Sequence, residues 1–575
     1  MNRKTIATTA VLLISVGSVV WADPKKKSKD MPESSNKLIE VIIQFEGKPS
    51  NSVRKVFQDL GINIKKELGE LDVLVLDLPM VLIDQLSDDP SVIYISPNRG
   101  VMPRLDYATP AVNGTAAYAS NWTGKGVGIA IVDSGISMHS DLGARIVYSE
   151  SFVGDGKPTT DLFGHGTHVA GIAGGNGTSS TGTAVGSVYT KTFRGIAPGA
   201  NIINLKVLDG NGAGTVAGVM AAISRAIEFK DKYNIKVLNL SLGHPVLESY
   251  KLDPLCNAVA MAWKAGIVVV VAAGNDGRNN DFGSSGYGTI NSPGNSPYVI
   301  TVGAMKTMTT ATRNDDLIAS YSSKGPTVID HVVKPDLVAP GNRLISLRSL
   351  GTWFSNTYAS NAVPLSYYSN TTGLDFSFVG SYYKLSGTSM AAPVVSGAAA
   401  LLLQKTPSLT PDQVKVRLMK TASKAFPATS VAIDPVTGAS YSSQYDLFTV
   451  GAGYVDITAA LSNTDLPQGS AKSPVASLNL KTGKVEVLIG KTVVWSETAK
   501  YGLSVVWGDM LFLKGTSVVW GDSVVWGDRT TAGYSVVWGD ASIWKTSVVW
   551  GDTSLASLTG IFSPEAINIA INGEK

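Results

Sequence analysis

Asp133 and His165 could together supply a carboxylate and an imidazole. Asp133 lies at the end of an expected strand, and His165 lies at the start of an expected helix. Asp133 closes the apolar run GVGIAIVD, which predicts a buried strand, and His165 lies in GHGTHVAG, where a helix of small residues is expected to begin. A carboxylate at the end of a buried strand can hold an imidazole in one tautomer. A neutral imidazole is the usual general base near neutral pH. Taken alone, Asp133 fits a turn residue that caps backbone amides equally well.

Two further residues provide a hydroxyl and an amide. Ser389 lies in SGTSMAAP, just before the apolar run VVSGAAALLLQ, which predicts a buried helix. The amides and dipole at a helix N-terminus favour negative charge, so a serine there can act as a nucleophile when a base is near. The alternative is an ordinary helix-capping serine. Asn275 follows the apolar run IVVVVAAG, and its amide could donate a hydrogen bond to a developing oxyanion.

The pair His165 and His168 also raises the alternative of a metal site. The sequence has no HExxH pattern and no cluster that would supply a third ligand. We therefore predict no catalytic metal, and we interpret His168 as a structural residue.

These residues must be positioned by the stretch 108–463, in which apolar β-branched runs alternate with helical patterns. Continuous apolar strands between helices indicate an α/β fold, with a doubly wound, mostly parallel sheet that is covered on both faces. Sites in such sheets lie at the carboxyl ends of strands, where Asp133 and Asn275 are expected. The predicted strands are GVGIAIVD, ANIINLKVL, IKVLNLSL, GIVVVVAAGN, YVITVGA and KPDLVAP.

The residues before this stretch have a different organisation. Residues 1–22 combine a basic start, an apolar run and a small-residue cleavage site, which predicts a secretory signal peptide. The alternative is a retained membrane anchor, for which the apolar run is short. Residues 23–37 are a polar linker. Residues 38–101 alternate between strand and helix patterns and predict a small α+β domain.

A repeat follows the central stretch. After a linker at 464–490, residues 491–575 contain copies of SVVWGD that begin at Ser504, Ser517, Ser523, Ser535 and Ser547. An even period keeps equivalent side chains on one face of a strand, and Gly-Asp marks turns. We expect short β-strands in hairpins or a small solenoid, with tryptophans stacked between repeats. Exposed tryptophan rows could instead bind a partner or a polymer, so a surface binding protein is the alternative function.

Composition excludes some classes of function. The formal net charge is +3, which gives no reason to expect a nucleic-acid partner. The single cysteine, Cys256, cannot form an internal disulfide, so packing must hold the chain together. We interpret Cys256 as a buried small apolar residue of a helix.

Together, three segments show that the chain resembles the subtilisin family of serine peptidases. The matching segments are Asp133-Ser134-Gly135-Ile136, His165-Gly166-Thr167-His168-Val169-Ala170-Gly171 and Gly387-Thr388-Ser389-Met390-Ala391-Ala392-Pro393, in the family's order. The resemblance covers about 108–463. It implies that Asp133 orients His165, that His165 takes the proton of Ser389, and that Asn275 stabilises the oxyanion.

The resemblance also implies substrates and partners. Ser241-Leu242-Gly243 is similar to the family's substrate-binding strand, and Gly212-Ala213-Gly214 is similar to its counterpart on the other side of the substrate. The substrates would then be polypeptides, and residues 38–101 would be a ferredoxin-like inhibitory propeptide that the enzyme itself removes by cleavage between 97 and 109. We expect a secreted, extracellular or periplasmic serine endopeptidase with no membrane association after signal removal.

The chain departs from the family pattern in two places. The segment 343–383 is longer than compact members need, which predicts either a surface loop near the substrate cleft or a tolerated insertion. The segment 174–193 is rich in Gly, Ser and Thr and lacks the Asn-rich calcium loop of some relatives. We expect the chemistry to need no cofactor, and a structural calcium cannot be assigned to any residues.

Overall fold

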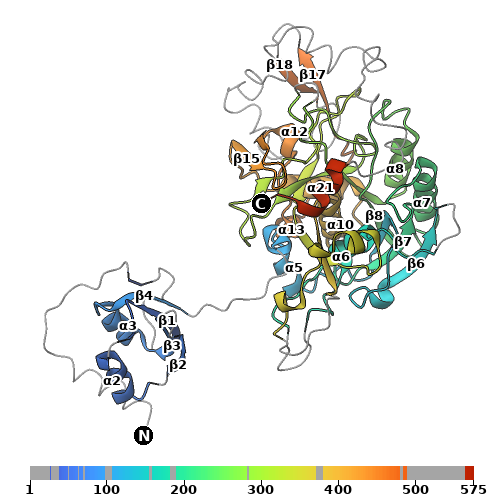
Figure 1. Ribbon diagram of the computed structural model, residues 1–575. Coiled ribbons are helices and arrows are strands. Elements are labelled where there is room, and N and C mark those ends of the chain that lie inside the picture. The colour runs from blue at the N-terminus through green and yellow to red at the C-terminus, as the bar shows by residue number, and fades with distance from the viewer. Residues whose placement is uncertain are drawn as a thin grey trace. The chain divides into compact units, whose positions relative to one another are not determined.

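The computed structural model divides the chain into two compact units, residues 1–102 and 103–575 (Figure 1). The residues that the structure describes are 26–27, 38–49, 51–62, 64–68, 72–97, 107–153, 158–181, 189–280, 284–370, 380–479, 484–488 and 564–574. The predicted signal peptide and the SVVWGD repeats lie outside these residues. Within the described residues no helix is both long enough and apolar enough to span a bilayer.

The first unit is a four-stranded antiparallel sheet with two helices. Its strands have the order β2-β3-β1-β4, which is the ferredoxin-like βαββαβ arrangement. Alternate residues of β1, such as Val41 and Ile43, are buried with Phe57 of α2 and Ile83 of α3. The elements are β1 (Ile39–Phe45), α2 (Asn51–Asp59), β2 (Ile64–Leu68), β3 (Val73–Leu78), α3 (Met80–Ser87) and β4 (Val92–Pro97).

The second unit is built on an eight-stranded sheet of order β11-β10-β9-β8-β5-β7-β6, with β12 paired to β10. Every described pair is parallel except β10 with β11, so the prediction of a mostly parallel α/β sheet is confirmed. The strands are β5 (Gly128–Asp133), β6 (Ile146–Ser151), β7 (Asn201–Lys206), β8 (Ile235–Leu240), β9 (Val268–Ala272), β10 (Ile300–Lys306), β11 (Leu317–Ile318) and β12 (Leu337–Pro340).

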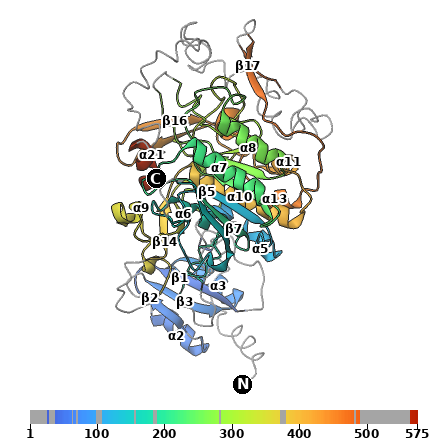
Figure 2. The ribbon, with the colours of Figure 1, turned by 90° about the vertical axis from the view of Figure 1, so that its right-hand side faces the viewer.

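The central strands are apolar because both faces of the sheet are covered. All residues of β5, β9 and β10 are buried. Helices α6 (His165–Gly174) and α10 (Thr388–Lys405) pack together, and α7 (Val216–Glu228) and α8 (Pro254–Lys264) form a second pair on the other side of the strands (Figure 1 and Figure 2). Cys256 lies in α8 and is buried, as predicted.

The long segment 343–383 is part of this unit. Its strands β13 (Leu344–Leu347) and β14 (Tyr382–Leu385) pair antiparallel, and helix α9 (Trp353–Thr357) lies between them in the chain. The amides of Trp353 and Phe354 donate to the carbonyls of Leu162 and Phe163. The ring of Trp353 stacks on Phe163, with centroids 5.4 Å apart. Helix α9 of this segment therefore packs beside the residues that lead into His165.

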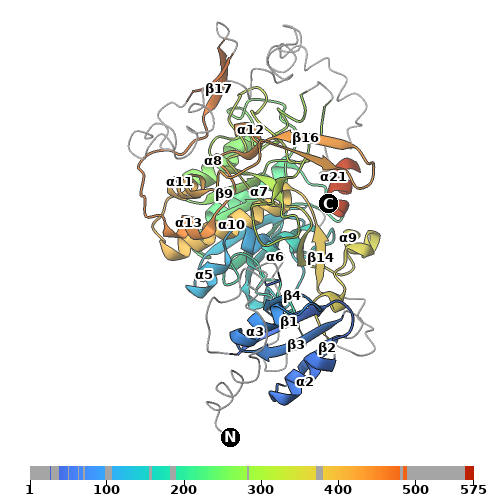
Figure 3. The same cartoon turned by 90° about the vertical axis from the view of Figure 1, so that its left-hand side faces the viewer.

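The remaining elements surround this core. Among them, α21 (Pro564–Asn572) is the last described helix and contacts β14 (Figure 3). The others are α4 (Ala108–Ala111), α5 (Thr115–Ala119), η3 (Gly143–Arg145), η4 (Ala359–Asn361), η5 (Leu365–Tyr367), α11 (Pro411–Thr421), β15 (Thr429–Ile433), β16 (Ser440–Gln444), α12 (Leu447–Val450), α13 (Ile457–Ser462), β17 (Val475–Asn479) and β18 (Lys484–Leu488).

Candidate active site

A buried hydrogen bond joins Asp133 to His165. Asp133 is the last residue of β5, and His165 is the first residue of α6. Nδ1 of His165 lies 2.8 Å from Oδ1 of Asp133, and both side chains are buried. Gly166 permits this approach, because a Cβ at that position would lie 2.2 Å from the carbonyl oxygen of Gly135. The structure thus brings the predicted carboxylate and imidazole together.

Asp161 fixes the loop that leads into α6. Its Oδ1 accepts hydrogen bonds from the amides of Phe163 and Gly164, and its Oδ2 accepts from the amide of Thr167. The hydroxyl of Ser134, the residue after Asp133, also donates to Oδ1. A carboxylate in this position satisfies amides that a helix leaves without partners in its first turn. Asp161 therefore connects the segments that carry both members of the Asp133–His165 pair.

The sheet register brings Ser389 toward the same region. Val132 of β5 is paired with Leu240 of β8, so Asp133 and Ser241 follow at the carboxyl ends of neighbouring strands. Ser241 and Ser389 are joined by two hydrogen bonds. The hydroxyl of Ser241 donates to the carbonyl of Ser389 at 2.8 Å, and the hydroxyl of Ser389 donates to the carbonyl of Ser241 at 3.1 Å. Ser389 is the second residue of α10, as predicted.

Asn275 lies against the same end of α10. Its Oδ1 accepts a hydrogen bond from the amide of Thr388 at 2.9 Å and a second from the hydroxyl of Thr388 at 3.1 Å. These bonds fix the side-chain amide, whose Nδ2 would lie 3.2 Å from a Cβ placed on Gly387. Gly387 has φ of 144°, a conformation that favours glycine. The structure thus places the predicted amide beside the residues that precede Ser389.

The two histidines of α6 have opposite electrostatic environments. Burial by itself lowers the pKa of His165, but the charge and hydrogen bond of Asp133 outweigh burial, so the pKa is raised above its ordinary value of 6.5. Burial, reinforced by His165, lowers the pKa of His168 to about 3. Nε2 of His168 lies 3.1 Å from the carbonyl of Leu344 and 3.0 Å from that of Tyr383. His168 is therefore a neutral residue that links α6 to β13 and β14, in agreement with its predicted structural role.

The two predicted substrate-binding segments follow β8 and β7, the strands that flank β5 in the sheet. Ser241 and Leu242 are buried directly after β8, whereas Gly243 is half-buried. Gly212, Ala213 and Gly214 follow β7 in a tight turn, in which the amide of Asp209 donates to the carbonyl of Ala213. A Cβ on Gly212 would lie 2.7 Å from the ring of Phe163. Phe163 thus separates this turn from Trp353 of the long segment.

Two residues that hold the site, Asp161 and Thr388, were not predicted from the sequence. Asp161 stands shortly before a glycine-rich helix start, a pattern typical of acidic residues near helix N-termini, and that signal was available. The role of Thr388 depends on Asn275, a residue distant in sequence, and only tertiary structure reveals it. Among the described residues, no three His, Cys, Asp or Glu side chains are grouped closely enough to hold a metal ion.

Comparisons with known proteins agree on one family. A model of the Subtilase family matches residues 124–453. Serine protease AprX of Bacillus subtilis is 40% identical over 344 residues, which cover 59% of this chain and 71% of that protein. An alkaline protease of Shouchella clausii is 31% identical over 427 residues, covering 73% of this chain and 93% of that protein. Subtilisin E of Bacillus subtilis is 30% identical over 430 residues, covering 73% and 94%. With a family match of this extent, the chain belongs to the subtilase family and is a serine-type endopeptidase.

Proposed function

We propose that the second unit cleaves peptide bonds through a triad of Asp133, His165 and Ser389. The observation that carries the proposal is the buried 2.8 Å contact between His165 and Asp133, at the end of the strand next to the one that leads to Ser241 and its bonds with Ser389. A carboxylate in this position keeps the proton on Nδ1 and leaves Nε2 to act as the base.

In the proposed reaction, Ser389 Oγ attacks the scissile carbonyl carbon while its proton passes to His165 Nε2. The carbonyl electron pair moves onto oxygen, and this oxyanion accepts hydrogen bonds from Asn275 Nδ2 and the Ser389 amide. His165 then gives its proton to the leaving amine, so the C–N bond breaks and an acyl-enzyme remains. Water repeats the sequence and releases the acid. In the structure Ser389 Oγ donates to the carbonyl of Ser241, so in the proposed reaction this hydroxyl gives up that hydrogen bond and donates to His165 Nε2 instead.

We further propose that the substrate binds as an added strand. Ser241, Leu242 and Gly243 would pair with one edge of an extended peptide, and Gly212, Ala213 and Gly214 with the other. This placement is supported by the position of the two segments after β8 and β7, on either side of β5, which ends in Asp133. Phe163 is buried beneath the second segment, and the half-buried Trp353 that stacks on it would limit the size of side chains that bind near that segment.

The test is inhibition and labelling of the full chain. We expect the purified protein to hydrolyse casein, phenylmethylsulfonyl fluoride to stop hydrolysis, and peptide mass spectrometry to find the sulfonyl group on Ser389. Ser389→Ala should abolish both hydrolysis and labelling. The exposed serine variant Ser462→Ala is the control and should retain both. Labelling of another serine with loss of activity would refute the proposed nucleophile.

We also propose that the enzyme is secreted as a precursor and removes residues 38–101 by its own activity. The support is the compact first unit, followed in the chain by a segment in which we predicted the junction, between 97 and 109. A Ser389→Ala chain should then accumulate as an uncut precursor that begins near Asp23. Mass spectrometry that finds normal cleavage in this variant would show that another protease performs the cut.

The alternative, a surface binding protein that acts mainly through its tryptophan repeats, is not favoured, because the family match covers residues 124–453. Replacing residues 492–560 by a Gly/Ser linker of equal length tests it directly. Casein hydrolysis should persist in that variant. If the wild-type chain binds a polymer but does not hydrolyse casein, the alternative is favoured.

A further inference from the structure

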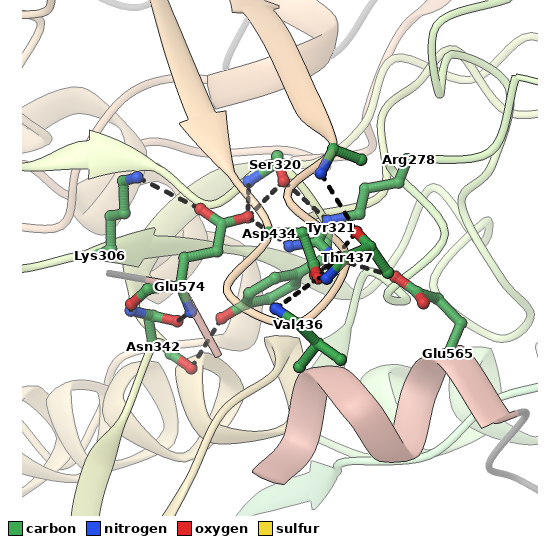
Figure 4. A network of polar contacts seen from close by, with 12 residues as sticks. Arg278, Lys306, Ser320, Tyr321, Asn342, Asp434, Val436, Thr437, Glu565 and Glu574 are labelled. Atoms are coloured by element: carbon green, nitrogen blue, oxygen red, sulfur yellow. Dashed lines mark hydrogen bonds and ion pairs between the residues drawn. The ribbon is translucent and has the colours of Figure 1, made fainter. Parts of the chain in front are cut away.

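The last described residues of the chain pack deeply into the second unit. Glu574 is 1% exposed, although it lies next to the C-terminal residue. Its backbone amide donates to Oδ1 of Asn342 at 2.8 Å, and Nδ2 of Asn342 donates back to its carbonyl at 2.8 Å. This reciprocal pair of hydrogen bonds holds the backbone of Glu574 against the side chain of Asn342. Figure 4 shows the side chain of Glu574 pointing into a polar cluster.

The carboxylate of Glu574 is surrounded by donors. Oε1 accepts from the amide of Ser320 at 2.9 Å, from the Ser320 hydroxyl, and from Nη2 of Arg278 at 3.0 Å. Oε2 lies 3.3 Å from Nζ of Lys306. The guanidinium of Arg278 also contacts Asp434 at 2.6 Å and the half-exposed Glu565 at 2.9 Å (Figure 4). A buried carboxylate is stable only with such partners, so this position is built for an acidic side chain.

This cluster reaches both sides of the candidate oxyanion site. On one side, Arg278 lies three residues after Asn275, in a loop that is anchored by the amide of Gly277, which donates to the carbonyl of Tyr321. On the other side, the amide of Ser386 donates to the carbonyl of Ala570 in α21 at 2.9 Å. Ser386 lies three residues before Ser389. One short segment of the chain thus contacts the loop of Asn275 and the strand that leads to Ser389.

We propose that residues 564–574 clamp the oxyanion site, with Glu574 as a positioning residue that fixes Asn275 relative to Ser389. This inference rests on the proposed roles of Asn275 and Ser389. Glu574 touches neither the substrate nor the reacting atoms. It acts through Arg278 on one loop, while Ala570 holds the other. The described residues before and after 489–563, the stretch that contains the repeats, both belong to the second unit.

The clamp differs from a purely stabilising tail in its kinetic effect. A displaced Asn275 weakens bonds that form only in the transition state, which lowers kcat and leaves KM nearly constant. A tail that only stabilises the fold changes the fraction of folded enzyme but not the turnover of each folded molecule. Titration of active sites with an acylating ester counts only competent molecules and therefore separates the two effects.

The experiment compares Glu574→Gln with Glu565→Gln in the full chain. Both variants remove one negative charge that contacts Arg278, but only the first carboxylate is buried. We expect Glu574→Gln to lower kcat per titrated site about tenfold, with KM changed less than about twofold. Glu565→Gln should change neither, because exposed ion pairs contribute little. An unchanged kcat in Glu574→Gln, whatever its melting temperature, would overturn the proposal.

A second variant covers the case in which Glu574→Gln does not fold. Glu574→Gln combined with Lys306→Met removes both charges of that contact, so neither is left buried without its partner, while Arg278 keeps Asp434. The clamp predicts the same loss of kcat in this folded variant, and wild-type turnover would overturn it. If the wild-type chain itself shows no hydrolysis, the proposed function fails. If the wild-type chain is active and both variants match it, only the clamp fails.

Discussion

His165 Nδ1 and Asp133 Oδ1 lie 2.8 Å apart, with both side chains buried at the end of β5. The bond fixes the orientation of the imidazole and keeps its proton on Nδ1. Asp133→Asn replaces the acceptor by an amide that can donate to Nδ1, so the wrong tautomer would be favoured. We expect kcat to fall about 10⁴-fold, with the fold retained. Steady-state kinetics measure the loss, and circular dichroism checks the fold. A decrease in kcat of less than about tenfold would contradict the role assigned to Asp133.

The pH dependence of activity should reflect the interaction between Asp133 and His165. Asp133 raises the pKa of His165 above its ordinary 6.5, and only neutral His165 can accept the proton of Ser389. Since the raised pKa favours the protonated form, activity is expected above the folded-state pKa and lost as pH falls through it. A profile of kcat/KM against pH should therefore have an acid limb with a midpoint above 6.5. A midpoint below 6.5 would mean that burial, rather than Asp133, dominates.

Asn275 is expected to contribute to turnover rather than to binding. Removal of one oxyanion donor lowers kcat by about 10²–10³ in subtilisin. Asn275→Ala should have an effect of this order, with little change in KM. Because Asn275 also accepts from Thr388, the control is Thr388→Val, which keeps the backbone donor and removes only the hydroxyl. We expect the control to lose less than about tenfold. Equal losses in the two variants would attribute the effect to packing of the loop.

Much of the fold is predictable because its signals are local. The runs that became β5, β8 and β9 are apolar and β-branched, a pattern typical of strands buried on both faces. Strands β2 (IKKEL) and β6 (IVYSES) were not predicted, because their polar residues break the apolar run. Where one face of a strand is exposed, the pattern is short and is easily read as a loop.

The residues of the candidate site also divide into those with a local sequence signal and those without one. Asp133, His165, Ser389 and Asn275 were identified because each stands in a distinctive segment at the boundary of an element. Residues that act through a distant partner have no such segment. Glu574 and Ser320 are 254 positions apart, and no local pattern distinguishes a C-terminal glutamate that is buried from one that is solvated. Pairing at this separation follows from the tertiary fold alone.

Asp161 provides a test of how α6 is positioned. Its buried carboxylate accepts bonds from Phe163, Gly164, Thr167 and Ser134, and Asp161→Ala would leave these donors without their acceptor. We expect a loss of roughly 3 to 5 kcal/mol in the free energy of unfolding. The measurement is urea denaturation in a Ser389→Ala background, which prevents self-digestion if Ser389 is the nucleophile. The comparison is Thr410→Ala, which removes the capping box of α11 and should cost about 1 kcal/mol. Equal losses of unfolding free energy in the two variants would show that Asp161 is an ordinary helix cap. A larger loss for Asp161→Ala means that one carboxylate organises both the loop before His165 and the turn after Asp133.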